Sequence, residues 1–115
     1  MEIKTRVTQT IPIIELQGRL DAHQGPRVEK KFAEITVNNN RTVVNLSKVH
    51  FIDSTGLSVL IKWAKRQREK QGDLVLCELQ QPVRIIFELT RLDRLFEIYA
   101  SENEALQALQ PALVG

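Results

Sequence analysis

The sequence holds a single cysteine, Cys77, so no disulfide can form within the chain. Without a second cysteine, neither a CxxC redox pair nor the four-ligand Cys/His set of a structural zinc site can be built. We therefore expect the protein to reside in a reducing cytoplasm. We also expect Cys77, which lies in an apolar run, to act as a small hydrophobic residue.

Aromatic side chains and net charge are both scarce. Only 5% of the residues are aromatic, and 16 Lys and Arg against 14 Asp and Glu give a formal net charge of +2. Nucleic-acid binding depends on clustered cations that neutralise phosphates, and single strands also need aromatic platforms for stacking. We therefore expect no nucleic-acid partner.

Long apolar runs and catalytic motifs are missing as well. The sequence has no run of about 18 apolar residues and no apolar signal region near its start, so we expect no membrane association. It has no GxSxG, HExxH, P-loop or GxGxxG pattern. His23 and His50 are the only ordinary bases near neutral pH, and such lone histidines are more often surface or packing residues. We expect no enzyme activity, no cofactor and no metal.

The composition is that of an ordinary globular domain. The chain has 115 residues, of which 43% are hydrophobic and 26% charged. No repeat, low-complexity tract or long linker divides it, and this length buries enough surface for one core without a staple. The sequence therefore predicts one domain over residues 1–115.

Hydrophobic periodicity predicts alternating strands and helices. Period-two or branched runs predict strands over Ile3–Val7, Ile11–Gln17, Thr42–Leu46, Asp73–Leu79 and Phe96–Ala100. Helical spacing predicts helices from Gly25 to about Asn38, Ser54 to about Gln71, Pro82 to about Leu92, and Glu102 to Leu109. We expect Ser47–Ile52 to be a connection whose Phe51 and Ile52 point inward. The order predicts an α/β fold, a mixed sheet opened by an antiparallel hairpin, with helices packed on it.

The helix expected from Ser54 has one clear apolar stripe. It comprises Leu57, Leu60, Ile61 and Ala64. Val59 lies opposite the stripe and is predicted to be exposed, and Trp63 lies beside it at the rim of the stripe. Either the two residues face a partner, or Trp63 belongs to the core. The stretch Lys65–Lys70 is expected to be a solvated helix end, and Gly72 to stop the helix in a left-handed conformation.

The most informative segment is Phe51-Ile52-Asp53-Ser54-Thr55-Gly56-Leu57, where a strand leads into a helix. One interpretation is structural: Asp53 or Ser54 caps the helix, and Gly56 allows close packing. The other is functional: a hydroxyl at a helix N-terminus can carry a phosphoryl group, because the helix dipole and free N–H groups tolerate the charge. The residues alone leave both interpretations open.

With these residues the chain resembles the STAS-domain anti-sigma factor antagonists, small bacterial proteins of partner-switching pathways. Beside the segment ending in Leu57, the resemblance rests on Gly18-Arg19-Leu20-Asp21, Val43-Val44-Asn45-Leu46, Gly72 before Leu74–Cys77, and Pro82-Val83-Arg84-Ile85-Ile86-Phe87 before Leu92. It spans nearly the whole chain. It implies the STAS fold and a regulatory protein without enzyme activity.

The resemblance also implies a switch. In this family the serine directly after the aspartate is phosphorylated by a kinase that doubles as the anti-sigma factor, which makes Ser54 the acceptor and Thr55 a secondary candidate. The unphosphorylated protein binds that kinase, phosphorylation prevents binding, and a PP2C-type phosphatase resets the protein. The implied partner-binding face comprises Asp21, Asp53, Thr55, Gly56, Ser58, Val59 and Lys62.

Two residues depart from the family pattern. Ser58 stands where many members have glycine, which places a hydroxymethyl group near the acceptor. Arg19 replaces the usual acidic residue and reverses a charge near Asp21. Both changes are expected to affect the choice of partner.

Two alternatives use the same residues differently. A two-component receiver would accept phosphate on Asp53, but the acidic pair that holds Mg²⁺ is missing, since Glu15 is alone in its strand and Asp21 lies in the next loop. A STAS scaffold or signalling module would keep the fold and have an output other than a sigma factor.

Overall fold

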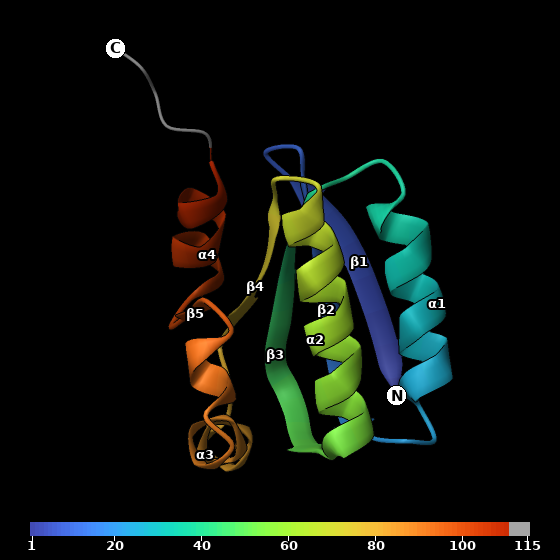
Figure 1. Cartoon of the computed structure of the whole chain (residues 1–115), viewed down its shortest axis with the longest axis vertical. Coiled ribbons are helices and arrows are strands. Elements are labelled where there is room, and N and C mark those ends of the chain that lie inside the picture. The colour runs from blue at the N-terminus through green and yellow to red at the C-terminus, as the bar shows by residue number, and fades with distance from the viewer. Residues whose placement is uncertain (111–115) are drawn as a thin grey trace.

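The computed structural model describes residues 1–110, so residues 111–115 of the expected domain lie outside the described part. The elements in chain order are β1 (Glu2–Thr8), β2 (Ile11–Leu20), α1 (Gly25–Thr36), β3 (Arg41–Ile52), α2 (Ser54–Glu69), β4 (Asp73–Cys77), α3 (Gln81–Leu89), a 3₁₀ turn (Leu92–Arg94), β5 (Ile98–Tyr99) and α4 (Glu102–Leu109). Figure 1 shows α1 and α2 side by side in front of the sheet. Within residues 1–110, no helix is both long and apolar enough to cross a bilayer.

The sheet has five strands in the spatial order β1-β2-β3-β4-β5. β1 pairs antiparallel with β2, and every later pair is parallel. Gln9 and Thr10 connect β1 to β2 with φ of 55° and 68°, the left-handed geometry of a tight hairpin turn. The predicted mixed sheet opened by an antiparallel hairpin is confirmed.

β3 is longer than the sequence predicts, because it continues beside β2 to Ile52. The prediction that Ser47–Ile52 is a connection is therefore wrong. Two register shifts against β2 insert extra residues into β3, and such bulges break the period-two pattern on which the prediction depended. Ile52 points inward and is 2% exposed, whereas Phe51 is only half-buried and its ring lies 3.9 Å from the Arg19 guanidinium carbon.

Two apolar clusters lie on opposite faces of the sheet. The larger one joins the sheet to α1, α2 and α3; its helical members include Val28, Phe32, Leu57, Leu60, Ala64, Val83 and Phe87. The smaller one lies under α4 and comprises Ile11, Ile13, Val43, Val75, Cys77, Ala105 and Leu106. The sheet is thus covered by helices on one face and only in part, by the short α4, on the other.

At the end of α2, the residue with left-handed backbone geometry differs from the prediction. The left-handed residue is Gln71, with φ of 61°, and not Gly72. Gly72 is needed for a different reason, because a Cβ there would lie 1.6 Å from the carbonyl oxygen of Asn40. β4, α3 and β5 are each shorter than predicted, whereas the predicted bounds of α4 are confirmed.

Candidate functional site

The candidate site lies where the carboxyl ends of β2 and β3 meet the start of α2. The backbone N–H of Asp53 donates to the carbonyl oxygen of Leu20 at 3.2 Å, which ties the two strand ends together. Ser54 is the first residue of the 16-residue α2 and is exposed. The fold therefore presents this hydroxyl at the edge of the sheet, at the helix N-terminus.

Asp53 is the N-cap of α2. It has extended backbone geometry, and its Oδ1 accepts the N–H of Gly56 at 2.9 Å. Its Oδ2 accepts the N–H of Ala22 at 3.0 Å, across the β2–α1 loop. The Gly56 N–H, helped by that of Ala22, holds the pKa of Asp53 below its ordinary value. Asp53 is therefore a fixed negative charge beside Ser54.

Capping by Asp53 leaves the Ser54 side chain unused in the structure. Within residues 1–110, the Ser54 hydroxyl makes no hydrogen bond, although its carbonyl oxygen accepts one from the Ser58 hydroxyl at 2.8 Å. The sequence offers Asp53 or Ser54 as the cap of this helix, and the structure shows that Asp53 is the cap. Modification of the Ser54 hydroxyl would therefore break no hydrogen bond of the fold.

Gly56 is buried against the end of β2. A Cβ at this position would lie 2.3 Å from the carbonyl oxygen of Leu20 and 2.9 Å from Cγ1 of Ile52. The close-packing interpretation of Gly56 is confirmed. Because the residue is covered by the protein itself, Gly56 seats α2 against the sheet and lies beneath the implied partner-binding face.

Val59 and Trp63 are buried, so the prediction that Val59 is exposed is wrong. Val59 is 6% exposed, as is Trp63. The reason is α1, which packs against this flank of α2: the Trp63 ring lies 6.1 Å from that of Phe32, and its Nε1 donates to Glu29 at 3.1 Å. A helical wheel takes account of one packing layer only, whereas α2 contacts two, the sheet and α1. Val59 therefore does not belong to an exposed partner face.

Thr55 also faces α1. A Cβ on Gly25 would lie 3.2 Å from the Thr55 Cγ2 atom, so the two helices approach closely at their N-terminal turns. The Thr55 side chain is thus half-buried, in contrast to that of Ser54. This geometry favours Ser54 over Thr55 as the reacting hydroxyl.

Asp21 closes the loop on the other side of the site. Its Oδ1 accepts the N–H of Gln24 at 3.1 Å, and its Oδ2 lies 3.5 Å from Nε of Arg19. Arg19 is in turn held over the ring of Phe51. The charge reversal noted in the sequence therefore places Arg19 in an ion pair with Asp21, at the same end of the sheet as Asp53.

Ser58 and Lys62, both in the implied partner-binding face, are exposed on α2. Lys62 forms an ion pair with Glu29 of α1, with Nζ 3.0 Å from Oε2. Glu29 thereby binds Lys62 and Trp63 together, a role that no sequence motif signals. The structure thus groups Asp21, Asp53, Ser54 and Ser58 at an open edge, and places Gly56 and Val59 beneath it.

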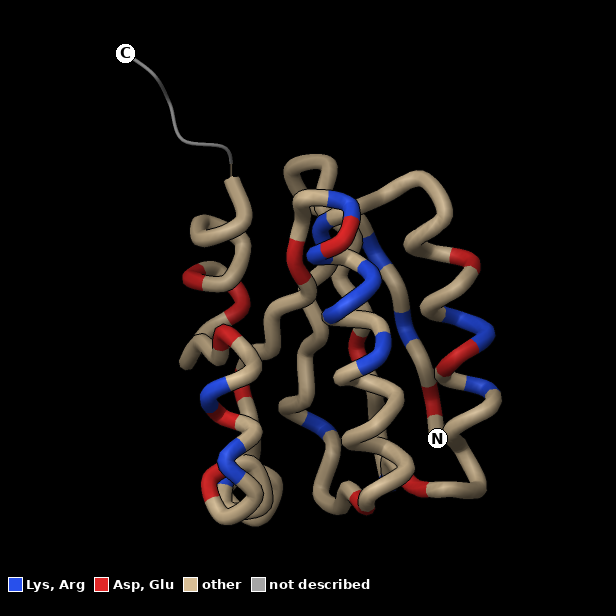
Figure 2. Tube along the Cα trace, in the orientation of Figure 1, with Lys and Arg blue, Asp and Glu red and all other residues tan. Residues whose placement is uncertain are grey.

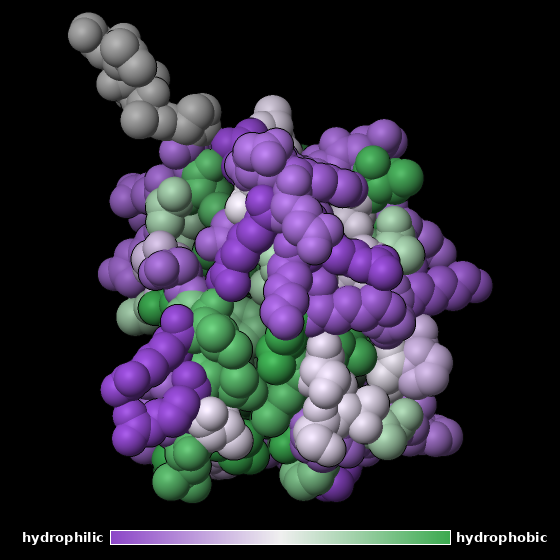
Figure 3. Space-filling model, viewed as in Figure 1, coloured by the Kyte–Doolittle hydropathy of each residue, from purple (hydrophilic) through white to green (hydrophobic). Residues whose placement is uncertain are grey.

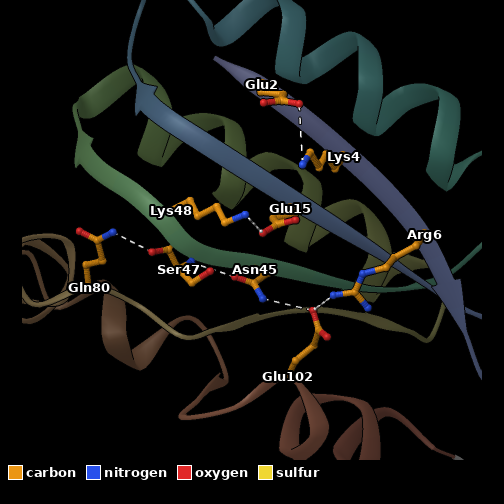
Figure 4. Close-up of polar contacts among 9 residues, drawn as sticks. All are labelled: Glu2, Lys4, Arg6, Glu15, Asn45, Ser47, Lys48, Gln80 and Glu102. Carbon is orange, nitrogen blue, oxygen red and sulfur yellow. Dashed lines mark hydrogen bonds and ion pairs between the residues drawn. The ribbon is translucent and has the colours of Figure 1, made fainter.

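A separate polar network covers the other face of the sheet (Figure 4). Glu102 of α4 accepts hydrogen bonds from Arg6 of β1 and Asn45 of β3. Lys48 lies 3.2 Å from Glu15 in the same region. The Glu102 contacts tie α4 to β1 and β3, and the Lys48 contact joins β3 to β2. Spacing along the sequence gives no sign of them, because their partners lie up to 96 residues apart.

Among residues 1–110, the other reactive groups show no second site. His23 and His50 are both exposed. Burial raises the pKa of the Cys77 thiol to about 12, which suits a packing residue and not a nucleophile. Within residues 1–110, no group of three His, Cys, Asp or Glu side chains is arranged to hold a metal ion. The receiver alternative is also disfavoured, because both oxygens of Asp53 already accept backbone N–H groups.

Comparisons of the sequence and of the structure with known proteins all find STAS domains or anti-sigma factor antagonists. A family model described as STAS domain matches residues 2–105. The anti-sigma-B factor antagonist of Listeria monocytogenes is 34% identical over 105 residues, which cover 90% of this chain and 91% of the relative. The anti-sigma F factor antagonist of Paenibacillus polymyxa is 27% identical over 112 residues, 96% of either chain. The solved structure of the anti-sigma factor antagonist SpoIIAA in its unphosphorylated form has a TM-score of 0.82 at 21% identity and covers 97% of this chain and 99% of that one.

Proposed function

The chain belongs to the STAS-domain family, and we propose that it is an anti-sigma factor antagonist switched by phosphorylation of Ser54. The names of its relatives support an anti-sigma factor as the binding partner. The observation that carries the proposal is that two neighbouring residues at the start of α2 have different roles. Asp53 caps the helix, so the exposed Ser54 hydroxyl is free to react.

The proposed partner is an anti-sigma factor that is also a serine kinase. It transfers the γ-phosphoryl group of ATP to Ser54: the bond from Oγ to phosphorus forms as the bond to the bridging oxygen of ATP breaks. ADP leaves, and the hydroxyl proton passes to a base of the kinase. A PP2C-type phosphatase reverses the modification by hydrolysis and releases inorganic phosphate. Because the donor is ATP, we place this cycle in the cytoplasm.

Charge is the proposed means of switching. A phosphoserine adds about −1.5 to −2 charges at neutral pH. At position 54 this charge would lie beside the ionised Asp53 and at the same edge as Asp21. Repulsion between these like charges, and the cost of removing water from the phosphate, both oppose docking of a partner selected to bind the unmodified edge. The helix N-terminus tolerates the phosphate, so the fold persists while binding is lost.

The experiment that tests this function combines phosphosite mapping with binding. Site-resolved mass spectrometry of the protein from its native cells should find phosphate on Ser54, removable by phosphatase. Tagged Ser54→Ala should retain an anti-sigma factor kinase from those cells, whereas Ser54→Asp should bind it at least about tenfold more weakly, or ~1.4 kcal/mol.

Thr5→Asp serves as the control, since Thr5 is exposed on the distant edge strand β1. It should bind as the unaltered protein does. Equal binding of Ser54→Ala and Ser54→Asp contradicts the charge switch. A retained kinase that binds no sigma factor redirects the proposal to a signalling module with another output.

A further inference from the structure

One flank of α2 continues the surface on which Ser54 lies. Lys65 follows Ser54 by eleven residues, which is close to three full turns at about 3.6 residues per turn. Lys65 therefore projects from the same side of α2 as Ser54, roughly 16 Å further along the axis at ~1.5 Å per residue. Ser58 and Ile61 lie between them on this side. A partner that binds around Ser54 and extends along α2 therefore contacts this flank.

The flank is hollowed on both sides of Ile61 and Lys65. A hollow of about 390 Å³ is lined by Ser58, Ile61, Lys62, Lys65, Arg66 and Glu69. A narrower one of about 30 Å³ is lined by Ile61, Ala64, Lys65, Arg68, Leu95 and Phe96. The two hollows share Ile61 and Lys65, so they form one surface with an apolar floor and a cationic rim. Figure 3 shows the apolar area beside the lower half of α2 and hydrophilic side chains above it.

The charges of this surface are of one sign with a single exception. Lys62, Lys65 and Arg66 line the larger hollow, and Glu69 is its one acidic residue. Among residues 1–110, Lys62 forms an ion pair with Glu29, whereas Lys65 forms none. In Figure 2 the basic residues lie along the upper half of α2 and acidic residues lie at its lower end. The basic residues of α2 thus lie in its second half, whereas its first turn holds no acidic residue and is directly preceded by the acidic Asp53.

We propose that this flank of α2 docks an acidic, amphipathic segment of the kinase that phosphorylates Ser54. The proposal rests on the function proposed above. A specific interface covers roughly 800 Å² on each partner, so a partner centred near Ser54 reaches as far as Lys65. Covering Lys65 removes water from an ammonium group without an ion pair, a cost that an opposite charge across the interface offsets.

The chemistry of the occupant follows from the two parts of the surface. Its carboxylates face Lys65, Lys62 and Arg66, and its apolar side chains lie over Ile61 and Leu95. Such a contact fixes the register in which Ser54 enters the kinase active site. It also makes the encounter dependent on ionic strength, because attraction between exposed charges is screened by salt.

Thiophosphorylation of purified variants by an extract of the native cells tests the proposal. The donor is adenosine 5′-O-(3-thiotriphosphate), whose product resists phosphatases, and site-resolved mass spectrometry measures the initial rate at Ser54. Lys65→Glu should lower this rate about tenfold, and Lys65→Gln by a smaller factor. Raising KCl from about 50 to 300 mM should slow the unaltered protein more than Lys65→Glu.

Lys30→Glu is the matched control, because Lys30 is also exposed on a helix and has no ion pair within residues 1–110. It should leave the rate within about twofold of the unaltered protein. Thermal unfolding of each variant separates a docking defect from a folding defect.

The possible results are distinct. Equal rates for Lys65→Glu and Lys30→Glu, with Ser54 of the unaltered protein modified, overturn the docking surface and leave the proposed function intact. No modification of Ser54 in the unaltered protein overturns the proposed function, and the docking surface with it. If sedimentation shows a dimer that Lys65→Glu disrupts while the rate is unchanged, the flank binds a second copy and the proposal is wrong.

Discussion

Asp53 accepts the backbone N–H of Ala22 at 3.0 Å, so the carboxylate that caps α2 also fastens the loop between β2 and α1. Its other oxygen holds the N–H of Gly56. A single side chain thereby fixes the distance between the start of α2 and the loop that carries Asp21. Ser54 lies directly after this junction, which fixes the position of its hydroxyl although that hydroxyl makes no hydrogen bond within residues 1–110.

Replacing Asp53 by Asn should lower the free energy of unfolding at neutral pH and change its pH dependence. The two N–H groups are held by different carboxylate oxygens, and an amide keeps only one of these oxygens, so one N–H group loses its acceptor. The pKa of Asp53 is lowered in the folded protein, so its contribution is fully present above the ordinary value of 3.8 and is lost as the pH falls through the folded value. Urea unfolding followed by Trp63 fluorescence at pH 7 and pH 3 measures this.

The unaltered protein should lose more stability between pH 7 and pH 3 than Asp53→Asn does. Asp93→Asn is the control, since Asp93 is exposed and its carboxylate accepts no hydrogen bond within residues 1–110. That variant should follow the unaltered protein. If Asp53→Asn loses as much stability as the unaltered protein over this range, the carboxylate is not the group that couples pH to the fold.

Much of this junction could be predicted from local sequence. Asp53 before Ser54 and Ser101 before Glu102 are typical helix caps, and α2 and α4 begin where those signals place them. The bond to Ala22 could not be predicted, because it joins residues 31 apart in the sequence. Its existence depends on β2 and β3 ending side by side, which only the sheet register reveals.

Gly56→Ala should destabilise the protein by about 1–3 kcal/mol, because the added methyl group meets a backbone oxygen that cannot rotate away. The Leu20 oxygen would lie 2.3 Å from the new Cβ. Gly25→Ala is the comparison: its Cβ would lie 3.2 Å from a methyl group of Thr55, and a side chain can adjust. That variant should change the free energy of unfolding by less than about 1 kcal/mol. The opposite order in urea denaturation would contradict the packing described for Gly56.

The prediction that Val59 is exposed is wrong for a physical reason. A helical wheel assigns burial from the helix's own apolar stripe, which is correct for Leu57 and Leu60. α1 then covers a second flank of α2, and Val59 and Trp63 are buried there. Which flank a neighbouring helix covers depends on the connection through β3, so periodicity within α2 does not contain this information.

A pair of valines tests this burial directly. Val59 is 6% exposed and Val37, at the end of α1, is 68% exposed. Val59→Ala should lower the free energy of unfolding by about 1.5 kcal/mol, since roughly 0.8 kcal/mol is lost for each buried CH₂ equivalent. Val37→Ala removes the same atoms from solvent contact and should change it by less than ~0.5 kcal/mol. Urea denaturation of both variants checks the difference. Equal effects would mean that α1 does not pack against Val59, and the flank of α2 opposite Lys65 would then be open to a partner.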